Sequence, residues 1–402
     1  MRPSPDSAAR STSSDAGPAF GVDPFFQPRR AAFWLLVLLL ANGFVYIGQL
    51  FVLGVRVVPV TALLGLAVWA LYTLAFVGVF RFFELLEQQS SSALVLAFAW
   101  GGLGAVRLAA PANAAIQSLA VKLVSPEFVA TWGPALAGPI TEEFTKLVGV
   151  LLLILVARTQ FRTELSVLIV GAMVGLGFQV VENLSYTVRA AISFPLENQW
   201  LPVLLNLATR GLLSGLWSHA AYTTVAAYGV AWYLRHVERS RAVRLGIAAL
   251  CFALAWGMHF VWKSPLLEDR FGNGPMDLGL LLVAKGLPVL LATALVWRAA
   301  MREDGAHLQA LAARLVPERE LLRDDEWVHL GSPLARYRAR RAAGQVDGRR
   351  ARRLTARLQR EQLRLVLKAG THGRGPQTVR HERAIRRLRA KLVLSGGKAV
   401  AR

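Results

Sequence analysis

The chain has 402 residues, of which 54% are hydrophobic and 18% are charged, and its formal net charge is +21. The charged share lies below the usual share of about a quarter, and the apolar residues gather in runs of about 20, which excludes an ordinary soluble enzyme and indicates a polytopic membrane protein. The only cysteine is Cys251, so neither an internal disulfide nor a thiolate metal cluster is expected.

The chain begins with a polar segment and then becomes apolar. Its first 28 residues are rich in Ser, Pro and Ala, so we expect a disordered N-terminal region over residues 1–30 and no cleavable signal peptide. Residues 31–300 form the predicted membrane domain, an all-α bundle of about eight transmembrane helices. The predicted spans are residues 31–53, 57–80, 93–110, 134–157, 165–188, 210–233, 243–263 and 277–300.

Arginines mark one side of the membrane. Arg29 and Arg30 precede the first predicted span, and further arginines follow the second, fourth, sixth and eighth spans. Positive residues stay on the cytoplasmic side, so a multi-pass protein of the cell membrane with both termini in the cytoplasm explains all of these arginines. This topology places five ionisable residues from four helices in the outer half of the bilayer: Glu142, Glu143, Glu182, His219 and His259.

The fourth predicted span carries two adjacent acids in the stretch TEEFTKL. Each ionisable residue costs roughly 2.5–3.5 kcal/mol at the centre of a membrane helix. Glu142 and Glu143 point about 100° apart on a helix, and Lys146 follows them by four and three residues. We therefore expect Lys146 to neutralise one carboxylate while the other faces a cavity. The alternative is a helix that begins at Pro139 and carries the acids in its first turns, where the helix dipole favours them.

The fifth predicted span carries a polar stripe on one helical face. Gly171 and Gly175 are spaced for close helix packing, and Glu182 follows Gly175 by seven residues. Gln179 lies three residues before Glu182 and Tyr186 lies four after it, so the stripe belongs inside a bundle and not against lipid. The alternative to a catalytic role is a structural hydrogen-bond network.

Two later spans each contribute one histidine. His219 follows Gly215 and precedes Thr223 by four residues, which predicts a closely packed helical seam. His259 lies on the seventh span, four residues before Lys263. A single membrane histidine usually serves packing, but two histidines at the depth of three glutamates indicate chemistry, because Glu and His exchange protons near neutral pH.

These groups suit peptide hydrolysis, which needs an acid–base for water and the leaving amine and a donor for the oxyanion. The sequence has no HExxH zinc helix, no GxSG serine motif and no paired intramembrane aspartates. EEFTK at residues 142–146 and ENLSY at residues 182–186, followed by His219 and His259, resemble the PrsW family of intramembrane proteases, which is related to the CAAX-type prenyl endopeptidases. The resemblance covers residues 30–300. Lys263 stands where prenyl endopeptidases carry an asparagine.

The resemblance implies a helical bundle that cleaves membrane-bound proteins, in the best-known case an anti-sigma factor at the start of a signalling cascade. It implies catalytic roles for Glu142, Glu143, Glu182, His219 and His259. Candidates for substrate binding are Lys146, Asn183 and Tyr186. We expect metal-free glutamate chemistry, and the alternative is zinc bound by Glu142, His219 and His259, because two His and one Glu form a known catalytic zinc set. The rival functions are a proton-coupled membrane carrier, which predicts discontinuous helices, and a non-catalytic membrane scaffold of the same fold.

The region after the last span is strongly basic. Residues 302–402 hold 25 Lys or Arg and 10 Asp or Glu, a net +15. Apolar stripes on two predicted helices accompany these charges: Leu354, Leu358 and Leu365 on one, and Ile385, Leu388 and Leu392 on the other. We expect residues 301–402 to form a basic helical cytoplasmic tail that lies on anionic lipid and has no catalytic role. Nucleic acid, the alternative ligand of such Arg runs, is not an expected partner.

Overall fold

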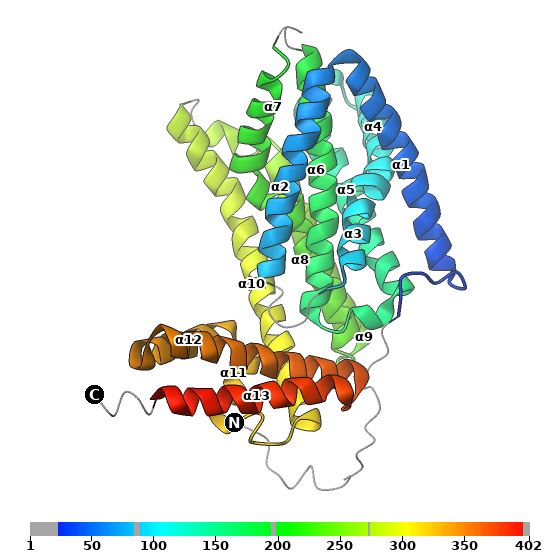
Figure 1. The fold of residues 1–402 in the computed structure, drawn as a ribbon. Coiled ribbons are helices and arrows are strands. Elements are labelled where there is room, and N and C mark those ends of the chain that lie inside the picture. Colours follow the sequence, from blue (N-terminus) through cyan, green and yellow to red (C-terminus); the bar gives the residue numbers. More distant parts are fainter. Residues whose placement is uncertain (1–22, 84–88, 194–197, 272–273, 397–402) are drawn as a thin grey trace. The chain divides into compact units, whose positions relative to one another are not determined.

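The computed structural model describes residues 23–83, 89–193, 198–271 and 274–396. The secondary structure of these residues is helical, with no strand among them, which confirms the predicted all-α class (Figure 1). The chain divides into two compact units. In the described part of the chain, the membrane unit comprises residues 24–83 and 89–300, and the basic unit comprises residues from 301 onward. Most of the predicted disordered N-terminal region lies outside the described residues.

Among the described residues, ten α-helices build the membrane unit, and short π- or 3-10-helical segments lie between some of them. α6 lies in its interior and contacts α2, α3, α5 and α8 (Figure 1). α10 supplies residues up to Ala300 to this unit and continues into the basic unit. In chain order the elements are α1 (Ala31–Val57), α2 (Pro59–Phe83), α3 (Ser91–Ala99), η2 (Trp100–Ala105), α4 (Val106–Leu123), α5 (Pro126–Val156), η3 (Arg158–Gln160), α6 (Glu164–Ser193), α7 (Leu201–Asn206), η4 (Leu207–Leu213), η5 (Gly215–Trp217), α8 (His219–Arg235), α9 (Arg241–Lys263), η6 (Glu268–Arg270) and α10 (Pro275–Leu315).

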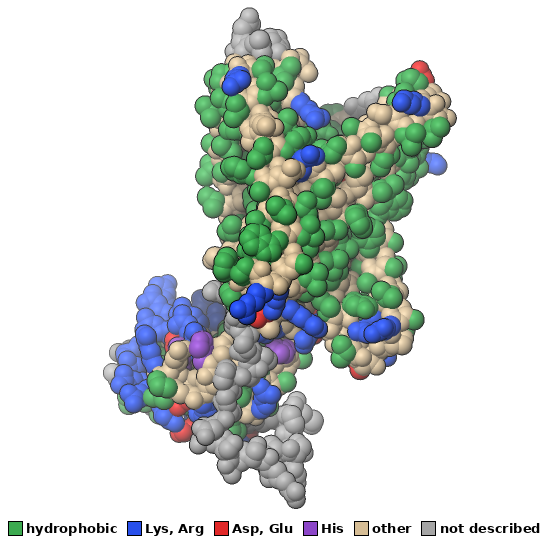
Figure 2. All heavy atoms as spheres, turned by 90° about the vertical axis from the view of Figure 1, so that its right-hand side faces the viewer, with side chains coloured by type: hydrophobic (Ala, Val, Ile, Leu, Met, Phe, Trp, Pro, Cys, Tyr) green, Lys and Arg blue, Asp and Glu red, His purple; other side chains and the backbone are tan. Residues whose placement is uncertain are grey.

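Six of the described helical segments are long and apolar enough to cross a membrane: Ala31–Val57, Pro59–Arg81, Ser91–Leu123, Glu164–Ser193, Arg241–Lys263 and Pro275–Leu315. Hydrophobic side chains accordingly cover much of the visible flank of the membrane unit (Figure 2). Two of the eight predicted spans do not meet this standard. α5 is long enough but carries Glu142, Glu143 and Lys146. α8 has 17 residues, so its length is about 25 Å, against a hydrocarbon core of about 30 Å.

The predicted sixth span, residues 210–233, is not one continuous helix. The π-helical η4 ends at Leu213, the 3-10 turn η5 follows, and α8 begins only at His219. Ser218 has an extended backbone, with φ −116° and ψ −151°. One glycine and two serines in the stretch SGLWS lower its helix propensity, which permits the break. The predicted helical seam is therefore interrupted, and His219 starts a helix instead of lying nine residues inside one.

Close contact between α6 and α8 follows the predicted glycine spacing. A Cβ atom added to Gly175 would lie 2.3 Å from the carbonyl oxygen of His219, and one added to Gly171 would lie 2.3 Å from the Cβ of Ala227. Any side chain at these two positions would push the helices apart. The glycines therefore let the backbone of α8 lie directly on α6, and this contact fixes the position of His219 relative to α6.

Trp100 of η2 positions the polar turn of α5. The indole is fully buried and donates from Nε1 to the carbonyl oxygen of Thr145 at 3.0 Å. A Cβ atom added to Gly149 would lie 1.9 Å from the Trp100 ring, so Gly149 provides the space that the indole fills. This packing holds α5 in place at the turn that carries Glu142 and Lys146.

The basic unit is a helical assembly with its own core. Beyond the end of α10 it contains η7 (Asp324–Glu326), α11 (Trp327–Gly331), α12 (Pro333–His372) and α13 (Pro376–Gly396). α12 bends sharply at Gly348, whose φ of 79° lies in the left-handed region that glycine adopts without strain. Across the bend, Arg340 Nε donates to Gln359 Oε1 at 2.7 Å. The two halves of α12 therefore fold back on each other.

The apolar stripes of the basic region form this core. Leu358, Leu365 and Ile385 are buried in it, and Leu388 and Leu392 pack against it. Leu354 is buried as well. The prediction that these stripes face lipid is wrong, because neighbouring helices cover them. The arginines on the outer faces of α12 and α13 remain exposed, and Figure 2 shows Lys and Arg side chains gathered on this unit.

Candidate active site

The two adjacent glutamates lie in the middle of α5. The helix begins at Pro126 and continues through Pro139, so Glu142 and Glu143 are not first-turn acids and the helix dipole does not explain them. Glu143 is buried, and its Oε1 accepts a hydrogen bond from Lys146 Nζ at 2.6 Å. Glu142 lines a cavity instead. The structure therefore shows the expected division, in which one carboxylate is neutralised and the other is available.

Each histidine of the site has one ring nitrogen close to a carboxylate. His259 Nδ1 lies 2.8 Å from Glu143 Oε1, and His219 Nε2 lies 3.0 Å from Glu182 Oε2. The opposite nitrogens, His259 Nε2 and His219 Nδ1, each lie 3.8 Å from Glu142 Oε2. Within the described chain, Glu142 Oε2 and His259 Nε2 are buried and have no hydrogen-bond partner. Glu142 Oε2 therefore lies close to two imidazole nitrogens, His259 Nε2 and His219 Nδ1, and it has no hydrogen-bond partner in the described chain.

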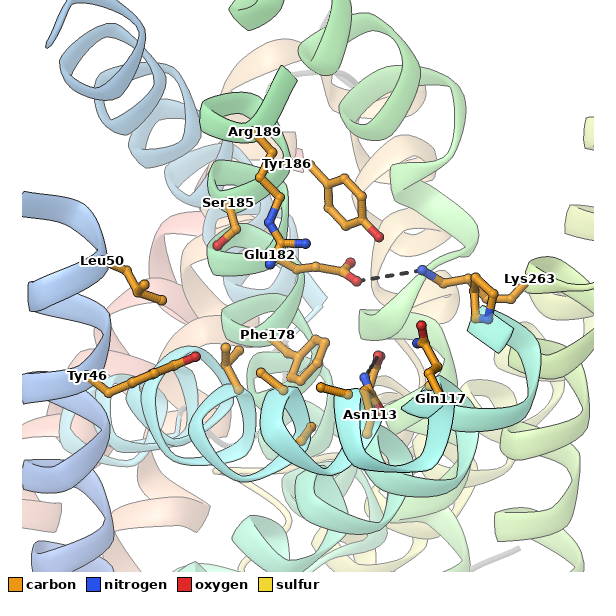
Figure 3. Close-up of a pocket in the computed structure, with 17 residues that line it drawn as sticks. Tyr46, Leu50, Asn113, Gln117, Phe178, Glu182, Ser185, Tyr186, Arg189 and Lys263 are labelled. Atoms are coloured by element: carbon orange, nitrogen blue, oxygen red, sulfur yellow. Dashed lines mark hydrogen bonds and ion pairs between the residues drawn. The ribbon is translucent and has the colours of Figure 1, made fainter. Parts of the chain in front are cut away.

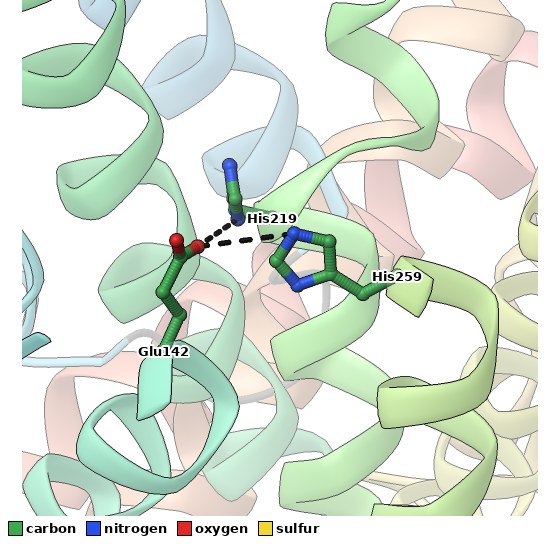
Figure 4. A group of neighbouring side chains, drawn as sticks. All are labelled: Glu142, His219 and His259. Carbon is green, nitrogen blue, oxygen red and sulfur yellow. Dashed lines mark ion pairs between the residues drawn. The ribbon is translucent and has the colours of Figure 1, made fainter. Parts of the chain in front are cut away.

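Glu142, His219 and His259 fit a divalent metal ion. Each offers one ligand atom, and these atoms lie within 4.8 Å of one another (Figure 4). Histidines that bind metal usually donate their other N–H group to a carboxylate, which fixes the orientation of the ring. Glu143 and Glu182 are placed to accept in this way. Lys146 Nζ lies 3.0 Å from His219 Nδ1, so the ammonium group and a metal ion are alternative partners of that nitrogen.

A cavity of about 380 Å³ adjoins these residues (Figure 3). Glu142, Glu182, Tyr186 and Lys263 line it, together with Asn113 and other residues of α4. The remaining predicted site residues do not contribute to the cavity wall: Glu143, Lys146, Asn183, His219 and His259. These five residues are buried behind the wall, at 3% exposure or less.

A family model described as PrsW family intramembrane metalloprotease matches residues 89–300, slightly more than half of the chain. The chain belongs to the PrsW family. It is therefore a membrane protease, and the matched region contains every predicted site residue. The comparisons with curated proteins and with solved structures gave no match.

This PrsW-family site contains cations that the sequence reasoning missed, among them Arg210. Arg210 of η4 donates from Nη2 to Glu182 Oε2 at 2.6 Å and from Nε to Asn183 Oδ1 at 2.7 Å, and its guanidinium lies 3.9 Å from the centre of the Tyr186 ring. Lys263 Nζ lies 3.6 Å from the other oxygen of Glu182. An arginine inside a predicted span was the available signal, because such a residue needs an acidic partner.

Proposed function

We propose that this PrsW-family protein is a zinc-dependent endopeptidase that cleaves a membrane-bound protein. The observation that carries the proposal is the convergence of Glu142 Oε2 and His259 Nε2, both without a partner among the described residues, on His219 Nδ1 beside a cavity that Glu142 lines. Two His and one Glu are a donor set that catalytic zinc sites use. This geometry favours the zinc alternative over the metal-free chemistry expected from the missing HExxH motif.

The proposed ligands are Glu142, His219 and His259. Zinc, when bound there, activates water and polarises the carbonyl of the scissile peptide bond. Glu143 and Glu182 accept the other N–H groups of the two imidazoles and so present the unprotonated nitrogens to the ion. Glu143 is thereby a positioning residue, and Lys146 offsets its charge in a buried site.

Glu182 is the proposed general base, because it lines the cavity and also contacts His219. It accepts a proton from water as the water oxygen bonds to the carbonyl carbon. It then delivers this proton to the amide nitrogen while the carbon–nitrogen bond breaks. Lys263, on the same cavity wall, donates to the oxygen that becomes negative. Tyr186 is 39% exposed and lines the cavity, so it is the candidate for substrate contact.

The substrate class follows from the membrane setting. With both termini in the cytoplasm, the site lies in the outer half of the bilayer, and cleavage releases the outer part of a membrane-bound protein. An anti-sigma factor is one candidate of this kind. The basic unit has no part in the chemistry, since every proposed catalytic residue belongs to the membrane unit.

Comparative membrane proteomics tests the proposal. A strain that expresses Glu142→Gln should accumulate full-length membrane proteins that the wild-type strain cleaves. Purified wild-type protein should contain one zinc per chain, lose cleavage with a strong chelator and recover it with zinc. Identical proteomes, with equal protein levels, would contradict the protease assignment.

The carrier hypothesis keeps one supporting observation, the discontinuous segment between α7 and α8. Reconstituted vesicles distinguish it from the protease. Proton uptake that depends on Glu182, in a preparation that cleaves nothing, would favour the carrier.

A further inference from the structure

An apolar groove adjoins the catalytic cavity. It lies between α1 and α6, has a volume of about 270 Å³, and its walls include Ile47, Leu53, Leu184 and Val188. Three residues line both spaces: Leu50, Ser185 and Arg189. The groove and the cavity therefore lie side by side and share part of their walls. Apolar side chains form most of the groove, whereas the cavity has polar and apolar walls.

The groove opens on an apolar flank of the membrane unit. α1 comes close to α6 at Gly54, where an added Cβ atom would lie 3.3 Å from Val188. Elsewhere along the groove, the side chain of Leu53 is 57% exposed and that of Leu50 is 45% exposed. Because α1 is one of the helices apolar enough to cross the membrane, these exposed side chains face hydrocarbon. A ligand reaches the groove from the bilayer.

Arg189 lines the cavity (Figure 3) and also the groove. Three other cations of the site each have a glutamate partner: Lys146 with Glu143, and Arg210 and Lys263 with Glu182. The Arg189 guanidinium makes no hydrogen bond or ion pair with another described residue. An unpaired cation at the edge of a membrane site favours an anionic group and disfavours a cationic one.

We propose that this groove receives the apolar membrane segment of the substrate, and that Arg189 pairs with an acidic residue at the end of that segment, next to the scissile bond. The proposal rests on the proposed protease function and adds a substrate class to it. The apolar walls match a membrane segment, and the shared wall places the groove next to the cavity that Glu142 and Glu182 line. A lipid phosphate is the other anion that an arginine at this depth could bind, and the experiment separates the two.

Charge reversal is the first test. The substrate used is the membrane protein that accumulates uncleaved in the Glu142→Gln strain. Arg189→Glu should reduce its cleavage roughly tenfold or more, because like charges then meet at the junction. Changing the acidic residue of the substrate to Lys should restore cleavage by this variant and impair cleavage by the wild type. Lys122→Glu is the matched control, since Lys122 is an exposed cation of α4 that lines neither space.

Filling the groove is the second test. Leu53→Trp adds bulk to the groove without touching the cavity, and Val45→Trp adds similar bulk to an exposed position of α1 that lines neither. Leu53→Trp should raise KM for the membrane substrate, and Val45→Trp should not. A photo-crosslinker at residue 53 in the Glu142→Gln background should label the apolar segment of the substrate.

Four outcomes overturn the proposal, and the first three leave the protease function intact. Unchanged cleavage by Arg189→Glu excludes the ion pair. Reduced cleavage that no lysine in the substrate rescues assigns Arg189 to a lipid phosphate. Crosslinks at residue 53 to lipid alone, with KM unchanged in Leu53→Trp, exclude the groove as the binding site. If no protein accumulates in the Glu142→Gln strain, the protease function itself fails, and the groove proposal fails with it.

Discussion

A buried glutamate occurs in both units of the molecule, and the two are held differently. In the membrane unit, Glu142 is 4% exposed, and one of its oxygens accepts from Asn113 Nδ2 at 3.0 Å while the other has no partner. In the basic unit, Glu326 accepts from Arg389 Nη1 at 2.8 Å, from Gln362 Nε2 at 2.7 Å and from the Arg323 backbone N–H at 3.1 Å.

The difference in hydrogen bonding distinguishes Glu142, a candidate ligand residue, from Glu326, a structural residue. Burial acts to raise the pKa of Glu326, but the hydrogen bonds from Arg389 and the Arg323 backbone outweigh it and hold that pKa below its ordinary value. A carboxylate whose oxygens are all satisfied stabilises the fold and has no capacity left for a ligand. A buried oxygen without a partner needs an explanation, and a ligand supplies one for Glu142.

The largest expected effect comes from changing the open glutamate. Glu142→Gln should lower cleavage roughly a thousandfold, the scale of a lost acid–base or ligand group. Because the amide keeps the shape of the carboxylate, the thermal unfolding temperature should change little. Glu326→Gln, the matched change in the basic unit, should leave the cleavage rate per folded molecule unaltered. Equal losses of cleavage in both variants would contradict the distinction drawn between the two carboxylates.

The second effect is on zinc affinity and concerns Glu143, whose carboxylate contacts His259 Nδ1. Glu143→Gln should weaken zinc binding about 10–100-fold, because the imidazole loses the carboxylate that orients it. Competition with a chromophoric chelator measures this affinity in purified protein without reference to cleavage. Glu127→Gln is the control, since Glu127 lies on the same helix and is exposed. An unchanged zinc affinity in Glu143→Gln would show that Glu143 does not position His259 for zinc binding.

The third effect is on the stability of the basic unit. Glu326→Gln should destabilise it by about 1–3 kcal/mol, because charge-assisted hydrogen bonds from Arg389 become neutral ones. The folded-state pKa is lowered, so this contribution is present above the ordinary carboxyl pKa of about 4.3 and is lost as the pH falls through the folded value. Hydrogen exchange of α11 to α13 in the full chain should differ between wild type and variant at pH 7 and converge in acid. A difference that persists at the lowest pH would assign the effect to packing.

Local geometry in the sequence predicted part of the site, and long-range packing decided the rest. The 100° step between Glu142 and Glu143 and the spacing to Lys146 were enough to expect one neutralised and one free carboxylate. The spacing of Gly171 and Gly175 likewise predicted a close helix contact. The partners of His219 and His259 could not be predicted, because they come from α5 and α6 at distances that only the bundle fixes.

Two expectations were wrong because a pattern was read without its surroundings. Residues 210–233 are apolar enough for a span, but Ser218 has an extended backbone, so the helix is interrupted there and α8 begins at His219. The leucine stripe of α12 has the period of an amphipathic helix, and that period does not say what covers the apolar face. A neighbouring helix covers it here, so lipid does not.

The last prediction concerns how the basic unit binds a membrane, and no change in cleavage is expected from it. Since its apolar stripes are buried, we expect it to bind anionic lipid through charge alone. Replacing Arg349, Arg350, Arg352 and Arg353 by Gln removes four exposed cations near the bend of α12. Each should contribute about 1 kcal/mol near an anionic surface, and less as salt screens it.

Full-length protein in nanodiscs provides the measurement. A fluorophore on α12 should report proximity to phosphatidylglycerol but not to phosphatidylcholine, and the four replacements should abolish the difference without altering cleavage. Val346→Ser is the control, because Val346 is 75% exposed beside the same bend and should matter only if apolar side chains insert into the bilayer. Loss of lipid contact in Val346→Ser would show that the basic unit binds by inserting apolar side chains into the bilayer. Salt-sensitive binding of nucleic acid, with no preference between the two lipids, would instead show that the arginines bind nucleic acid, the alternative ligand.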